Sequence, residues 1–81
     1  MGNLALSADG VIKLYNVNKK ILDNFDDLLD EFYNWKKTSC YDEQLFVKFL
    51  QNKFGTTAVQ FVKNLGWDIP KEYENVRWYN F

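Results

Sequence analysis

The stretch "LALSADGVIKLYNV", residues 4–17, decides the fold because it has the pattern of a β-hairpin. Small and apolar residues lead into the turn sequence Ser-Ala-Asp-Gly, in which Gly10 can adopt a positive φ. A β-branched and aromatic strand follows over residues 11–17. Along this strand Ile12 and Leu14 point to one face, which is dry, while the other face is mixed. We therefore predict a hairpin at the centre of a small sheet.

The segment "NVRWYNF", residues 75–81, is also β-branched and aromatic and predicts a C-terminal strand. A helix cannot run into it from before, because Pro70 lacks an amide hydrogen and favours an extended Ile69. A lone strand needs a partner, so we expect this strand to pair with the hairpin. The result would be a small antiparallel sheet that contains both ends of the sequence.

Three helices are predicted between the hairpin and the C-terminal strand. The first covers residues 19–37, with Asn18 as its N-cap and one apolar stripe made by Ile21, Phe25, Leu28, Leu29 and Phe32. The second covers residues 41–54, with Ser39 as a candidate N-cap and Gly55 as its stop. The third covers residues 57–65, with Ala58, Phe61, Val62 and Leu65 on one apolar face. The predicted class is α+β: an N-terminal β-hairpin, a three-helix cluster and a C-terminal strand, with the sheet packed against the helices.

Length and composition indicate one domain, residues 1–81, because a chain of 81 residues buries only about 60–65% of its unfolded surface. The one cysteine, Cys40, cannot close a disulfide within the chain, which favours a reducing compartment. No apolar run approaches the roughly 20 residues that cross a bilayer, and no targeting signal is apparent. We expect a cytoplasmic protein without membrane contact.

The sequence lacks the residue types that most catalytic and metal sites use. It has no histidine and one cysteine, which leaves neither a zinc constellation nor an imidazole to activate a nucleophile. Its four glycines form no phosphate-binding or dinucleotide-binding loop. We predict that the protein is not an enzyme and uses no cofactor or metal.

Acidic residues gather on the first predicted helix and basic residues further along. Residues 21–35 contain five acids and no base, whereas residues 44–66 contain three lysines and no acid. Asp23, Asp27 and Asp30 share one side of the helix, with Glu31 beside them. Two interpretations stay open: a solvated helix face, or a surface that meets a basic groove on a partner protein.

Large aromatic residues form the second candidate surface: Trp35, Trp67, Trp78 and Tyr79. They are either lids at the edge of the core or exposed anchors for a partner, a role in which Trp and Tyr are enriched. With the acidic helix, they favour a small protein-binding module, such as an adaptor, inhibitor or regulatory factor. The composition is compatible with a bacterial or bacteriophage source. The module would act as a monomer or as a homodimer through an open sheet edge.

An alternative function rests on "LQNKFGTTAVQFVKNLG", residues 50–66, which resembles a DNA-binding helix-turn-helix with its corner at Gly55. In a transcriptional regulator of this type, the helix 57–65 would present to DNA the side chains of Thr57, Gln60, Lys63 and Asn64. Gln51 and Thr56 depart from the small and apolar residues that such a corner uses. Three lysines would also neutralise few phosphates. A plain helical hairpin in the core is the other interpretation.

Overall fold

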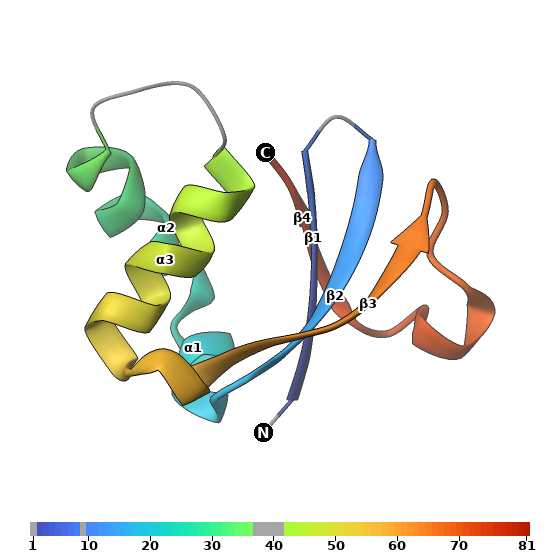
Figure 1. Ribbon diagram of the computed structural model, residues 1–81, viewed down its shortest axis with the longest axis horizontal. Coiled ribbons are helices and arrows are strands. Elements are labelled where there is room, and N and C mark those ends of the chain that lie inside the picture. The colour runs from blue at the N-terminus through green and yellow to red at the C-terminus, as the bar shows by residue number, and fades with distance from the viewer. Residues whose placement is uncertain (1, 9, 37–41) are drawn as a thin grey trace.

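The computed structural model of the protein describes residues 2–8, 10–36 and 42–81. It contains a four-stranded sheet in the order β3 (Val59–Gly66), β2 (Val11–Val17), β1 (Gly2–Ala8) and β4 (Arg77–Asn80), with the α-helices gathered on one side of it (Figure 1). An N-terminal strand pair, three α-helices and a C-terminal strand confirm the predicted α+β class. The candidate N-cap Ser39 and Cys40 lie outside the described residues.

The predicted hairpin is confirmed as strands β1 (Gly2–Ala8) and β2 (Val11–Val17), which pair antiparallel. Gly10 between them has a φ of 90°, the conformation that the turn sequence predicts. Strand β4 (Arg77–Asn80) joins the same sheet beside β1, but it runs parallel to β1 and not antiparallel as expected. The direction follows from the connection: β3 ends beside Ile12, and the chain returns to the opposite end of the sheet before β4 begins beside Leu4.

The first predicted helix is divided into α1 (Lys19–Asp23) and α2 (Phe25–Trp35). Asn18 caps α1 as predicted, since its side-chain oxygen accepts a hydrogen bond of 2.9 Å from the Lys20 amide. The division falls at Asn24, whose side-chain nitrogen donates to the Lys20 carbonyl at 2.9 Å. An asparagine that bonds the backbone in this way competes with the regular helix pattern. Helix α3 (Asp42–Phe54) matches the second predicted helix and ends at Gly55, with a φ of 102°.

The predicted helix over residues 57–65 is wrong. A 3-10 turn, η1 (Thr56–Ala58), leads into strand β3 (Val59–Gly66), which pairs antiparallel with β2 and contains two register shifts. Pairing with β2 satisfies the backbone of this β-branched and aromatic segment without burying a helical stripe. Only Ala58 and Val59 enter the core, and residues 60–64 are all exposed. The apolar face assigned to this helix therefore does not exist.

Both faces of the central strands are buried, although the sequence predicts one dry and one mixed face. The helices cover one face and enclose a core rich in phenylalanine, which includes Leu4, Leu6, Tyr15, Val17, Phe25, Phe32 and Phe46. The other face buries Ala5, Ile12 and Leu14. It is crossed by residues 67–76, which contain the 3-10 turn η2 (Lys71–Tyr73) and join β3 to β4 on the side away from the helices (Figure 1). The two central strands, β1 and β2, are therefore enclosed on both sides.

Candidate functional site

The acidic residues predicted to bind a partner lie on the outward side of α1 and α2. Asp23, Asp27 and Asp30 are exposed, and none of them forms an ion pair with another residue in the described ranges. Glu31 differs, because its carboxylate lies 2.6 Å from the Lys53 ammonium of α3. The break at Asn24 separates Asp23 from the other two, so the longest continuous acidic side belongs to α2.

The structure does not bring the four predicted aromatic residues into one patch. Trp78 and Tyr79 are neighbours in β4, and therefore point to opposite faces of the sheet. The Tyr79 ring packs 5.9 Å from Phe25 at the core edge. Trp67 is 72% exposed, and its ring lies against Gly10 at the far end of the hairpin. Trp35 is thus the aromatic residue of this set that lies on the acidic helix α2.

A small cavity opens beside Trp35, and we call it the Trp35 pocket. Its volume is about 210 Å³, and it is lined by Trp35, Phe49, Asn52 and Lys53. The ring centroids of Trp35 and Phe49 lie 5.4 Å apart, so two aromatic rings form its apolar walls. The ion pair between Lys53 and Glu31 lies beside it and links α2 to α3. The pocket can therefore receive an apolar side chain next to polar groups.

The acidic side of α2 leads directly to this pocket. Asp27, Glu31 and Trp35 follow one another at intervals of four residues, which places them on one side of the helix. The opposite side of α2 is buried through Phe25, Leu28, Leu29 and Phe32. Burial of that side fixes which way the charged side faces, so acids and pocket form one continuous surface.

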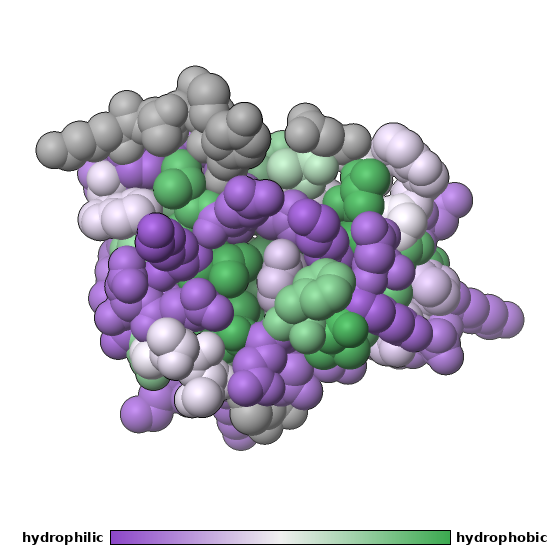
Figure 2. All heavy atoms as spheres, viewed as in Figure 1, coloured by the Kyte–Doolittle hydropathy of each residue, from purple (hydrophilic) through white to green (hydrophobic). Residues whose placement is uncertain are grey.

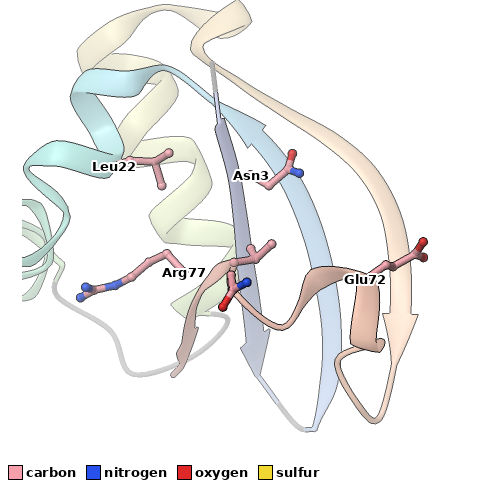
Figure 3. Close-up of a pocket in the computed structure, with 6 residues that line it drawn as sticks. Asn3, Leu22, Glu72 and Arg77 are labelled. Carbon is pink, nitrogen blue, oxygen red and sulfur yellow. The ribbon is translucent and has the colours of Figure 1, made fainter.

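A second cavity, of about 420 Å³, lies between α1 and the segment before β4 (Figure 3). Its lining consists of Asn3, Leu22, Glu72, Asn75, Val76 and Arg77. Figure 3 shows that Arg77 extends toward the helices whereas Glu72 extends to the opposite side. The Arg77 guanidinium is already engaged, 2.5 Å from Asp26 and 4.9 Å from the centroid of the Phe25 ring. The polar groups of this cavity thus do not converge on a reacting atom.

The residues predicted to contact DNA lie on η1 and β3 and not on a helix. Thr57 belongs to η1, and Gln60, Lys63 and Asn64 belong to β3. Lys63 pairs with Glu72 at 3.8 Å, with its ammonium 4.9 Å from the centroid of the Tyr73 ring. The Asn64 side-chain oxygen accepts a hydrogen bond from the Gly66 amide at 2.7 Å. Two of the four side chains therefore have partners within the protein.

Strand β3 exposes two apolar side chains that the sequence places on a buried helix face. Phe61 is 58% exposed and Val62 is 48% exposed. Figure 2 shows hydrophobic side chains over the middle of β3, surrounded by hydrophilic ones. The signal for this strand is the run Val-Gln-Phe-Val after two threonines, which is dense in residues that favour strands.

A buried polar cluster joins α3 to β2, and no local sequence pattern predicts it. Glu43 is 4% exposed; its carboxylate accepts a hydrogen bond of 3.1 Å from the Tyr15 hydroxyl and lies 3.8 Å from the Lys13 ammonium. Burial, and then the charge of Glu43, raise the pKa of Tyr15 well above its usual value. Since both groups are enclosed by the fold, we assign this cluster to the packing of α3 on the sheet.

The described parts of the chain contain neither a candidate metal cluster nor a candidate membrane-spanning helix. Residues 2–8, 10–36 and 42–81 contain no group of three or more His, Cys, Asp or Glu side chains that could hold a metal ion. Within the same ranges, no helix combines the length and apolar character needed to cross a bilayer. No protein-family model, curated protein or solved structure matches the chain. The candidate site is the surface of α2 with the Trp35 pocket, where exposed acids lie beside two aromatic rings.

Proposed function

We propose that this protein is a small non-catalytic binding module that occupies the surface of a basic partner protein through α2. The observation that carries the proposal is the position of Trp35: 47% exposed, beside a pocket, and in line with Asp27 and Glu31. An exposed tryptophan next to a pocket is the kind of residue that dominates binding energy at interfaces. Asp27 and Asp30 form no ion pair within residues 2–8, 10–36 and 42–81, and such exposed charges favour a partner of opposite charge.

The two parts of this surface would contribute differently to binding. Burial of the Trp35 ring and of the pocket walls removes apolar area from water, which supports affinity. Exposed charges such as Asp27 and Asp30 act mainly on the rate of association, and salt screens them. The proposal therefore predicts binding whose association rate falls as the salt concentration rises.

A helix-turn-helix regulator is not proposed, because the helix that would read DNA is strand β3. Titration of this protein with random duplex DNA at low salt serves as a control for the charge-based proposal. Since β3 supplies a single lysine, and that lysine pairs with Glu72, we expect no binding at tens of micromolar protein.

The partner can be captured on the immobilised protein from the source cell, identified, purified and used in association-rate measurements. The informative variant is Asp27→Asn with Asp30→Asn; the matched control is Asp68→Asn with Glu74→Gln, which changes net charge equally but lies in the segment 67–76. At low salt we expect the α2 variant to slow association by about tenfold and the control to have little effect. Equal effects of the two variants would overturn the proposal, because net charge alone would then explain the rate.

A further inference from the structure

The Trp35 pocket has the size of a site for one side chain. Small-molecule and cofactor sites usually enclose about 300–1,000 Å³. The Trp35 pocket, at about 210 Å³, is smaller than that range. Its two aromatic walls suit an apolar group, and Asn52 and Lys53 supply polar groups to its lining. This geometry fits the anchor residue of a protein partner better than a free metabolite.

The walls of the pocket are held in place by the core. The Phe49 ring is nearly buried and lies 5.8 Å from Phe32 and 6.3 Å from Phe46, between ring centroids. The Trp35 ring lies 6.1 Å from Phe32 and 5.4 Å from Phe49. A pocket whose walls are already ordered loses little side-chain entropy when it is filled. The site is therefore preformed on the scaffold side.

The charges beside the pocket select for a basic occupant. Lys53 is matched by Glu31 at 2.6 Å, so this pair adds little net charge. The net charge along this side of α2 comes from Asp27, which has no ion pair in the described ranges. An acidic segment, or an anionic lipid surface, would be repelled. Charge complementarity thus favours lysine or arginine at some distance from the apolar anchor.

The spacing on α2 indicates the shape of the occupant. At a rise of about 1.5 Å per residue, Asp27 lies roughly 12 Å along the helix from Trp35. A second helix that packs along α2 at a shallow angle presents its side chains at the same intervals. Its basic residue would then fall about eight positions from the residue in the pocket.

On this basis we propose that the Trp35 pocket anchors one bulky apolar side chain of a basic amphipathic helix, of which a lysine or arginine residue pairs with Asp27. This inference rests on the proposed function and adds the chemistry and spacing of the partner. It joins a preformed aromatic pocket to an acid on the same side of one helix. Recognition of an amphipathic helix by a hydrophobic groove is a common mode of peptide binding.

The test is a selection of displayed, randomised helical peptides against the full chain, followed by affinity measurements on the enriched sequences. We expect enrichment of a bulky apolar residue with lysine or arginine about eight positions away. Trp35→Ala should weaken the binding of these peptides about thirtyfold or more, the level at which a residue counts as a binding hot spot. Asp27→Asn should reduce the salt dependence of their binding. Phe61→Ala is the control, because it removes an exposed aromatic ring from β3.

A second variant guards against a folding defect of Trp35→Ala. Asn52 is exposed and lines the pocket, so Asn52→Tyr should obstruct the pocket without a change of charge and should also weaken binding. Failure to enrich the expected pattern, or enriched peptides that bind both pocket variants normally, would overturn this inference. The proposed function would survive that result if the captured partner still depended on Asp27 and Asp30, and it would fail separately if it did not.

Discussion

Helix α2 and strand β3 both present aromatic side chains to solvent, but the fold holds them in different ways. Helix α2 buries one complete side against the core and leaves Asp27, Glu31 and Trp35 outside. Strand β3 is held along one edge by β2, and residues 60–64 are exposed without interruption. An element with one buried side can be predicted from the spacing of its apolar residues. An exposed edge strand that is held by backbone hydrogen bonds has no such spacing.

The largest effect on stability is expected when an aromatic ring is removed from α2, and we compare it with the removal of a ring from β3. Phe32 is fully buried, with ring centroids of Phe46 and Phe49 at 5.2 and 5.8 Å. We expect Phe32→Ala to lower the free energy of unfolding by about 3–5 kcal/mol, because it leaves a cavity among these rings. Phe61→Ala should cost less than about 1 kcal/mol, since most of that ring is already in water. Urea denaturation of both variants measures the difference.

Equal losses of unfolding free energy in Phe32→Ala and Phe61→Ala would contradict this prediction, because β3 would then contribute to the core as much as α2 does. If Phe32→Ala proves too unstable to purify, Phe32→Leu in its place retains most of the volume. We expect that variant to cost less than the alanine variant and still more than Phe61→Ala.

An intermediate effect is expected where the end of β3 meets the hairpin. Gly10 has a φ of 90°, and a Cβ placed there would lie 2.5 Å from the Trp67 ring. Gly55 has a φ of 102° but open space around it. We expect Gly55→Ala to cost about 1–2 kcal/mol from backbone strain alone, and Gly10→Ala to cost more because of the added clash. Thermal unfolding of both variants compares them.

The decisive control repeats Gly10→Ala in a protein that carries Trp67→Ala. In the Trp67→Ala background, the additional loss of stability from the clash should disappear. Gly10→Ala should then cost about as much as Gly55→Ala, from backbone strain alone. A cost unchanged by Trp67→Ala would show that the ring does not rest on the hairpin, and that the end of β3 is as loosely attached as its middle.

A third effect, of similar size, concerns Tyr15, which links the two regions. Its ring packs 5.8 Å from Phe61, and its hydroxyl donates to the buried Glu43. Tyr15→Phe removes that donor and should cost about 1–3 kcal/mol near neutral pH. Burial, followed by the charge of Glu43, raises the pKa of Tyr15 above its ordinary value of 10.0. This contribution is therefore complete below about pH 10 and is lost as the pH rises further.

Denaturation curves at about pH 9 and about pH 11 test the direction of this pH dependence. The wild type should lose stability over this interval faster than Tyr15→Phe, so the gap between them should narrow. Tyr33, whose pKa is raised to about 12 by burial and by its hydrogen bond to Tyr79, adds an alkaline loss common to both proteins. A gap that widens with pH would contradict the assignment of Tyr15 as the buried donor to Glu43.

The features predicted correctly from sequence are those that neighbouring residues determine. The hairpin, the Asn18 cap, the left-handed Gly55 and the apolar stripe of α2 each depend on residues a few positions apart. The direction of β4 and the pairing of β3 depend on distant segments, and local patterns contain little information about them. The helix prediction failed for β3 because a short apolar run fits both the helical period of about 3.6 residues and the strand period of about two. No buried side of β3 favours one of these periods over the other.

The same division applies to the candidate site. The exposed acids of α2 and the partly exposed Trp35 could be predicted, because a charged helix side opposite an apolar stripe is a local pattern. The pocket could not, because Phe49, Asn52 and Lys53 reach Trp35 only through the packing of α3 against α2. The separation of Trp67 and Trp78 from Trp35 follows from the topology of the sheet, which the sequence pattern did not contain.

The parallel strand β4 also has a consequence for the order of folding. The hydrogen bond from the Ser7 hydroxyl to the Asn80 side chain joins residues 73 positions apart, whereas β1 and β2 are neighbours in the chain. Hairpins close in about 1–10 μs, but contacts between distant segments must first overcome the entropy of closing a long loop. We therefore expect β4 to dock after the rate-limiting step. Substitutions at Trp78 would then accelerate unfolding in stopped-flow measurements and leave the refolding rate unchanged.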